Sequence, residues 1–255
     1  MPDSARTTGT TRLRQLGYDI GPPFPLHFVV EGDHHLALDG VFLHRTVKMP
    51  PCDDAGVTVE AAFVAYCADV RLIDAIEVGC FLLHKEWMHG DLLDQLLTDA
   101  KWRRGAPETA YALPFLDDRP RSMPEAVLLA YVVFSGLLVP EVNLRVEIAP
   151  GVRVTPDQWF GRLRAAVEYE GGHHQDDRAQ YNADIDRYAD YRKHDVAYEL
   201  VTKERMRTPK TVIRKVHSML VSRGYDGPPP DFDETWDSLF RPLQELVRPR
   251  TRGKR

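Results

Sequence analysis

Residues 156–174 read PDQWFGRLRAAVEYEGGHH and decide the fold of the C-terminal half. A turn near Gly161 separates two short apolar runs, which predicts a β-hairpin. Alternate residues of a strand share one face, so Glu168 and Glu170 point the same way, roughly 7 Å apart. If Asp157 lies on the paired strand, its carboxylate approaches Glu168 from the side.

Three carboxylates that converge on one point repel each other unless a cation lies between them. Oxygen ligands at that density suit Mg²⁺ or Mn²⁺ better than Zn²⁺. The pattern therefore predicts a metal site with Asp157, Glu168 and Glu170 as ligands, in which the metal activates a water for phosphodiester cleavage. The alternative is that these acids are strand ends that face open solvent.

The hydrophobic periodicity around the hairpin predicts an α+β domain. An apolar helix comes before the hairpin, and a charged helix, a strand and a last helix follow it. This order is that of an α-β-β-β-α-β-α sandwich. The predicted elements are helix 124–136, strands 142–148, 152–160 and 163–169, helix 176–194, strand 196–202 and helix 209–223.

Asp157 and the later run from Glu168 to His173 resemble the DUF559 domains, a branch of the PD-(D/E)xK nuclease superfamily related to very-short-patch-repair endonucleases. The resemblance covers roughly residues 120–222 and implies a restriction endonuclease-like fold. It marks His173, which follows two glycines, as a candidate general base. It also implies that Glu125, at the start of its helix, reaches the metal through a water. Glu170 stands where the superfamily has its signature lysine.

Residues 24–115 resemble the region that precedes this domain in actinobacterial AbiEi-like, or type IV antitoxin-like, proteins. Leu26 to Val29 and Val41 to Arg45 match its strands, and the run from Val59 to Lys101 matches its helices. Those relatives usually begin with a winged helix. Only about twenty residues precede Pro22, so we expect that module to be absent.

The stretch from Asp117 to Arg121 is charged, contains proline and lacks periodicity, which is typical of a domain boundary. We therefore expect a smaller mixed N-terminal domain beside the nuclease-like one. The expected segments are a disordered N-terminus (1–21), an AbiEi-like α+β domain (22–116), a DUF559-like domain (120–224) and a Pro-rich segment with a basic tail (225–255).

Composition narrows the class of protein. The formal net charge of −5 argues against a general nucleic-acid coat protein but allows a local basic groove. Cys52, Cys67 and Cys80 form no CxxC pair, which favours reduced thiols and a cytoplasmic location. The longest apolar run, Ala126 to Val139, is too short to cross a bilayer, so we expect no membrane contact.

A basic run follows the last predicted strand and is a candidate surface for DNA. Such a strip beside the acidic site would hold a phosphate backbone, although charge runs are more often solvated helix faces. Its candidate DNA-binding residues are Lys203, Arg205, Arg207, Lys210 and Arg214.

These observations leave three hypotheses for function. The first is a Mg²⁺- or Mn²⁺-dependent endonuclease that acts on DNA. The second is a non-catalytic regulator or antitoxin-like protein that binds DNA, a toxin or another protein with the same scaffold. The third is a degenerate protein without remaining activity.

Overall fold

The computed structural model of the chain describes residues 2–171 and 178–248. It confirms the expected α+β class. The chain forms two compact units: the first comprises Met1–Leu116 with Phe240–Arg255, and the second comprises Asp117–Leu239. The second unit is therefore inserted into the first.

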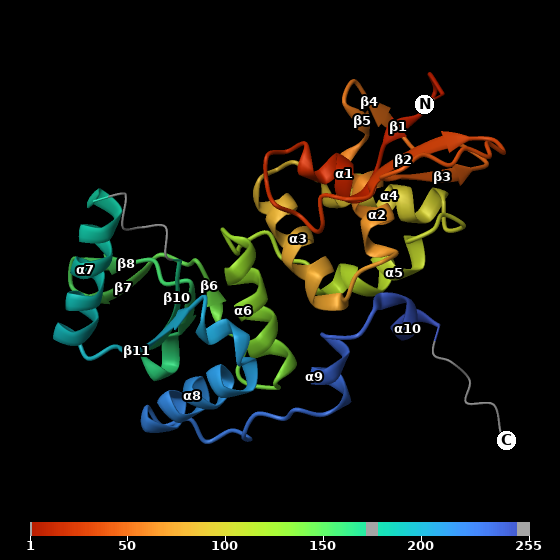
Figure 1. Cartoon of the computed structure of the whole chain (residues 1–255). Coiled ribbons are helices and arrows are strands. Elements are labelled where there is room, and N and C mark those ends of the chain that lie inside the picture. Colours follow the sequence, from red (N-terminus) through yellow and green to blue (C-terminus); the bar gives the residue numbers. More distant parts are fainter. Residues whose placement is uncertain (1, 172–177, 249–255) are drawn as a thin grey trace, which may run out of the picture. The chain divides into compact units, whose positions relative to one another are not determined.

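The first unit combines a small sheet with a group of helices (Figure 1). In the three-stranded sheet β1 is antiparallel to β2, and β2 is parallel to β3. Side chains that pack between the helices include Phe63 and Leu82, which are fully buried. The elements are β1 (Arg6–Thr7), α1 (Gly9–Arg14), β2 (Leu26–Glu31), β3 (Val41–Thr46), β4 (Cys52–Asp53), β5 (Gly56–Val57), α2 (Val59–Cys67), α3 (Leu72–His84), α4 (Gly90–Asp99), α5 (Ala106–Ala112) and η1 (Leu113–Phe115).

The expected disorder of residues 1–21 is wrong. This segment forms β1 and α1, and the side chains of Leu13 and Ile20 are buried. Arg12 fixes the helix because its Nε donates to the carbonyl oxygen of Val57 at 2.9 Å and its Nη2 pairs with Asp53 at 2.7 Å. A few buried groups thus order a segment whose overall composition is polar.

The second unit is built on a four-stranded sheet in the order β11-β10-β9-β6. Strand β10 is antiparallel to β9 and parallel to β11, while β6 is antiparallel to β9. Helix α7 lies on one side of this sheet and α6 and α8 on the other (Figure 1). The elements are α6 (Met123–Phe134), β6 (Glu141–Val142), β7 (Val146–Ala149), β8 (Val152–Val154), β9 (Gln158–Phe160), η2 (Gly161–Leu163), β10 (Ala165–Glu170), α7 (Arg178–Lys193), β11 (Ala197–Thr202), η4 (Arg205–Arg207), α8 (Pro209–Ser222) and α9 (Glu234–Ser238).

The two predicted strands before η2 are each broken in two. Strand 142–148 is interrupted after β6, where Asn143 takes a positive φ of 49° that no extended strand allows. Strand 152–160 is interrupted before β9, where Pro156 has no N–H to give to a ladder. The halves before and after these breaks separate, so that β7 and β8 pair with each other in a sheet of their own.

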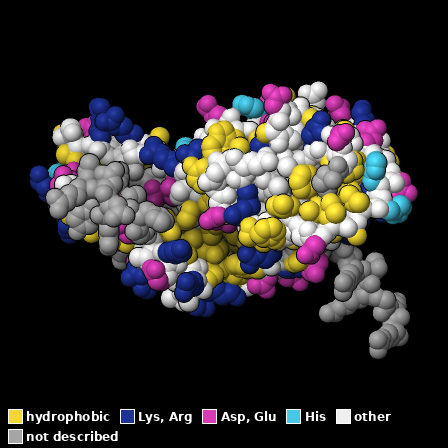
Figure 2. Space-filling model, turned by 45° about the horizontal axis from the view of Figure 1, so that its top comes forward, with side chains coloured by type: hydrophobic (Ala, Val, Ile, Leu, Met, Phe, Trp, Pro, Cys, Tyr) yellow, Lys and Arg dark blue, Asp and Glu magenta, His cyan; other side chains and the backbone are white. Residues whose placement is uncertain are grey.

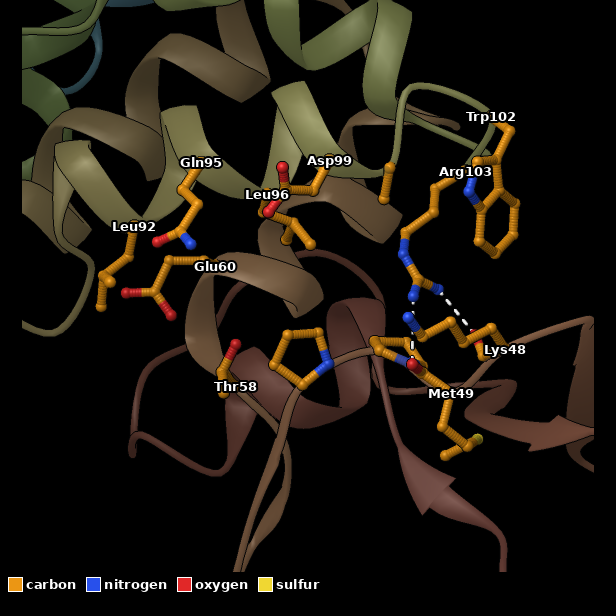
Figure 3. A pocket seen from close by; sticks show the side chains of 13 residues that line it. Lys48, Met49, Thr58, Glu60, Leu92, Gln95, Leu96, Asp99, Trp102 and Arg103 are labelled. Carbon is orange, nitrogen blue, oxygen red and sulfur yellow. Dashed lines mark hydrogen bonds between the residues drawn. The ribbon is translucent and has the colours of Figure 1, made fainter.

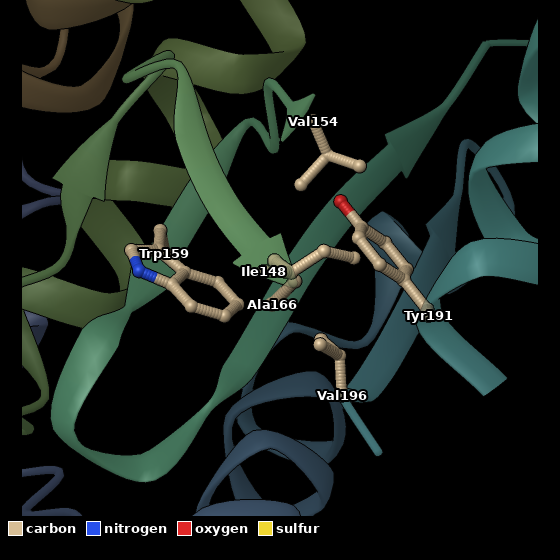
Figure 4. Packing of buried hydrophobic residues seen from close by; sticks show 6 residues of the cluster. All are labelled: Ile148, Val154, Trp159, Ala166, Tyr191 and Val196. Carbon is tan, nitrogen blue, oxygen red and sulfur yellow. The ribbon is translucent and has the colours of Figure 1, made fainter. Parts of the chain in front are cut away.

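The core on the α7 side of the sheet is a cluster of buried apolar side chains (Figure 4). Trp159 of β9 and Ala166 of β10 are cross-strand partners and share this face. The ring of Tyr191 from α7 packs into the same cluster. Because strand residues alternate, the same face carries Asp157 and Glu168, two residues further towards the strand ends.

The end of the chain departs from the expected organisation. Residues 225–255 do not form one separate segment, because α10 (Leu243–Val247) returns to the first unit. The N–H of Leu243 donates to the carbonyl oxygen of Val70 at 2.9 Å, and the side chain of Leu243 is fully buried. Burial of Leu243 stabilises the packing of α10 in the first unit, so this stretch does not pack with the residues that precede it in the sequence.

Candidate functional site

Asp157 and Glu168 lie opposite each other across the β9–β10 pair. The ladder joins Gln158 to Val167, and one further step of the same register brings Asp157 beside Glu168. The N–H of Tyr169 donates to Oδ2 of Asp157 at 2.7 Å, and the N–H of Asp157 lies 3.5 Å from Oε2 of Glu168. The predicted lateral approach of these two carboxylates is therefore present in the structure.

Helix α7 encloses the carboxylate of Glu168, which is only 1% exposed. The hydroxyl of Tyr191 donates to its Oε1 at 2.6 Å. Arg187 lies one helical turn earlier, with its Nη2 at 3.6 Å from Oε2 of Glu168 and at 2.9 Å from Oδ1 of Asp184. Oε1 is thus held firmly by a short hydrogen bond, whereas Oε2 has only long contacts.

The electrostatics of the pair favour added positive charge. Burial raises the pKa of Asp157 well above its usual range, and the nearby carboxylates of Glu168 and Glu125 raise it further. Burial also raises the pKa of Glu168, although Arg187 and the Tyr191 hydroxyl oppose the rise. One guanidinium therefore does not balance the carboxylates that surround it.

Glu125 has a clear structural role in addition to its place near Asp157. Its carboxylate accepts hydrogen bonds from the N–H of Arg121 at 2.9 Å and from the hydroxyl of Ser122 at 2.8 Å, at the N-terminus of α6. Nδ2 of Asn143 donates to the same carboxylate at 2.9 Å, while the N–H of Asn143 donates to the carbonyl oxygen of Asp157 at 3.1 Å. Asn143 therefore connects the helix cap to the strand that carries Asp157.

The expected convergence of three carboxylates is wrong for the described residues. Glu170 accepts a hydrogen bond from the hydroxyl of Tyr188 at 3.0 Å, which holds it to α7. Over residues 2–171 and 178–248, no group of three or more His, Cys, Asp or Glu side chains is placed to hold a metal ion. His173 falls outside the described residues.

The remaining pair still fits a hard divalent cation. Mg²⁺ is commonly bound by one or two carboxylates and completes its shell with water and substrate phosphates. Oδ1 of Asp157 accepts no hydrogen bond from the described residues, and Oε2 of Glu168 is loosely held. Asp157 and Glu168 are thus the two residues that fit the group, and Glu170 is not a third.

The predicted DNA-binding residues form an exposed basic strip that begins just after β11 and runs through η4 into the first turns of α8. Figure 2 shows Lys and Arg side chains gathered along the lower left margin, where Figure 1 places α8. Arg205 pairs with Glu199 at 3.1 Å. Lys210 and Arg214 lie 5.3 and 5.2 Å from the centre of the Phe232 ring, so they share one face of α8. Lys203 and Arg207 are exposed.

Sequence reasoning missed part of this site. The ring of Tyr191 is part of the core, but its hydroxyl donates a hydrogen bond to Glu168. The helical spacing of Arg187 and Tyr191 (one turn apart) was the available signal. For Asn143, its tolerance of positive φ was the only hint.

Comparison of the chain with protein-family models, with curated proteins and with solved structures finds no match. In the described part of the chain, no helix has both the length and the apolar character needed to cross a membrane. The three cysteines are free thiols, and Cys67 and Cys80 are buried. What the protein does must therefore be argued from the acidic site and the basic strip.

Proposed function

We propose that the protein is a metal-dependent endonuclease-like enzyme that hydrolyses phosphodiester bonds in DNA. The observation that carries this proposal is the Asp157–Glu168 pair: two carboxylates forced together across two strands, with pKa values raised by burial and, for Asp157, by neighbouring carboxylates. Pairs of carboxylates with raised pKa values are concentrated at sites where a cation or a reaction uses them.

The arrangement of the second unit supports the same proposal. Its sheet has three antiparallel strands followed by one parallel strand, with helices on both faces. This is compatible with the restriction endonuclease-like sandwich that the DUF559 resemblance implies. Asp157 directly precedes β9 and Glu168 lies on β10, two neighbouring strands of this sheet.

Each residue has a distinct role in this proposal. Asp157 and Glu168 would hold Mg²⁺ or Mn²⁺, which when bound lowers the pKa of a coordinated water and neutralises phosphate charge. Tyr191 orients Glu168 through its short hydrogen bond. Arg187 supplies positive charge in place of the missing lysine, since among the described residues its guanidinium is the one that pairs with Glu168. Asn143 and Glu125 hold the Asp157 strand in place.

Plasmid nicking is the direct test. We expect the purified chain to nick supercoiled DNA in Mg²⁺ or Mn²⁺, and Asp157→Asn to lower the rate by about a hundredfold or more, because one of the two metal ligands is lost. Asp186→Asn is the matched control, since Asp186 is an exposed acid on α7 away from the pair. Calorimetric titration of Mn²⁺ into wild type and Glu168→Gln measures metal binding separately. Absence of both nicking and metal binding in the wild type would refute the proposal.

A second candidate function is a non-catalytic, antitoxin-like regulator that binds DNA or a protein partner. The observation that favours it is the exposed basic strip, in which Lys203, Arg207, Lys210 and Arg214 remain open to solvent. It predicts DNA binding that survives Asp157→Asn and that weakens with added salt. The nuclease predicts instead that cleavage and metal binding disappear together in that variant.

A further inference from the structure

The first unit contains a cavity of about 490 Å³ that is separate from the acidic site and independent of the proposed function. It lies among the start of α2, one face of α4 and the chain after β3 (Figure 3). This volume is within the range of sites that bind small molecules. The walls are mixed, with Leu92, Leu96 and Met49 as apolar surface and several polar side chains among them.

Glu60 is the residue of this cavity whose unused hydrogen-bonding capacity indicates a ligand. Its side chain lines the cavity although the residue is only 7% exposed. Oε1 accepts one hydrogen bond, from the N–H of His89 at 3.1 Å, just before α4 begins. Among the described residues, Oε2 accepts no hydrogen bond and no Lys or Arg forms an ion pair with Glu60. A carboxylate offers about four lone-pair positions, so most of the capacity of Glu60 is unused.

The polar side chains of the cavity besides Glu60 are a second acid, Asp99, the amide of Gln95, the hydroxyl of Thr58 and two cations, Lys48 and Arg103. Gln95 and Asp99 are four residues apart on α4, so they share the helix face that lines the cavity. Figure 3 shows the Gln95 amide close to Glu60 at one end, with Arg103 and Trp102 at the other. Arg103 is occupied there, because its Nη1 and Nη2 donate to the carbonyl oxygens of Lys48 and Met49 at 2.9 and 3.0 Å.

We propose that this cavity binds a small organic cation: a primary ammonium group on an apolar chain. An ammonium supplies the N–H donor that Oε2 of Glu60 lacks, and the amide oxygen of Gln95 and the carboxylate of Asp99 line the same cavity as further acceptors. The hydrocarbon part of the ligand packs on the side chains of Leu92 and Leu96. An anion would meet two carboxylates at this end, and a neutral alcohol would leave the buried charge of Glu60 uncompensated.

Three probes of equal length test the chemistry: n-hexylamine, hexan-1-ol and hexanoate, titrated into the full chain by calorimetry or by ligand-observed NMR. We expect hexylamine to bind about tenfold or more tightly than hexanol, because a hydrogen bond to a buried charge is lost with the alcohol. Hexanoate should not bind. No detectable hexylamine binding at about 10 mM, or equal binding of hexanoate, would overturn the proposal.

Variants then locate the binding site. Glu60→Gln keeps an acceptor for the His89 N–H but removes the charge, so it should weaken hexylamine about tenfold and leave hexanol unchanged. Asp99→Asn, at an exposed position, should weaken hexylamine by a smaller factor and keeps the test open if Glu60→Gln does not fold. Glu86→Gln is the matched control, an exposed glutamate of the same unit outside the cavity. Unchanged hexylamine affinity in both Glu60→Gln and Asp99→Asn would refute the assignment.

Discussion

Glu168 and Glu60 are both buried carboxylates, but they differ in their hydrogen-bond donors and in the charges beside them. Glu168 is enclosed by its own unit, with a tyrosine hydroxyl on one oxygen, a guanidinium near the other and Asp157 beside it. Glu60 has one main-chain donor and an open cavity. The first is a crowded site in which carboxylates repel each other, and the second is a buried carboxylate with one hydrogen bond and an unfilled cavity beside it. The number and kind of donors, rather than burial alone, therefore separate the two sites.

A half-buried acid of the first unit, Glu77, has a raised pKa without belonging to either site. Burial and the neighbouring Asp74 raise the pKa of Glu77, in α3, to about 7, and Arg71 opposes the rise. The folded state then holds the proton more tightly than the unfolded chain does. Its contribution to stability is complete below the usual pKa of about 4.5 and is lost as pH rises through about 7.

We expect Glu77→Gln to remove this loss, which amounts to roughly 3 kcal/mol. Urea denaturation of wild type and variant between about pH 4 and 8 measures it. Glu86→Gln, at an exposed position of the same unit, should follow the wild type. If Glu77→Gln also changes DNA nicking or hexylamine binding, then the raised pKa of Glu77 marks a functional site and is not an effect of burial alone.

The contact between Arg187 and Glu168 predicts a loss of stability when the guanidinium is removed. Arg187→Met removes the guanidinium beside Glu168 but keeps much of the side chain, so a buried carboxylate loses its neighbouring cation. We expect a loss of about 2 kcal/mol at neutral pH, shrinking as the pH falls and Glu168 takes up a proton. Arg192→Met, at an exposed position of the same helix, is the control. An equal loss in both variants would mean that Arg187 supports α7 and not the site.

The repulsion at Asp157 predicts a smaller effect of opposite sign. Asp157→Asn keeps an oxygen for the Tyr169 N–H and removes a charge that burial, Glu168 and Glu125 all disfavour. The variant should therefore gain about 1 kcal/mol at neutral pH. Because the folded pKa is raised, the wild type loses stability as pH rises out of the acid range, so the gain should vanish near the usual pKa of an aspartate. A variant that is less stable at pH 7 would show that Asp157 is a structural group.

Much of the fold followed from sequence patterns that are local. Strand β10, strand β11 and helix α8 lie close to the predicted ranges, since alternation and helical stripes survive in each. The breaks at Asn143 and Pro156 were missed because both residues stand inside apolar alternation that suggested continuous strands. At the site, pairing across one hairpin brought Asp157 to Glu168, as the spacing predicted. The position of Arg187 depends on how α7 packs on the sheet, which no local pattern encodes.

The return of α10 has a practical consequence for any shortened form of the protein. The N–H of Leu72 donates to the carbonyl oxygen of Arg241, and Leu243 is buried against the helices that follow β5. A chain that ends after Leu239, the last residue of the second unit, would lack α10, which packs with the first unit. Truncation there is expected to harm the amino-terminal half, whereas cutting out Asp117–Leu239 and rejoining the ends spares every one of these contacts.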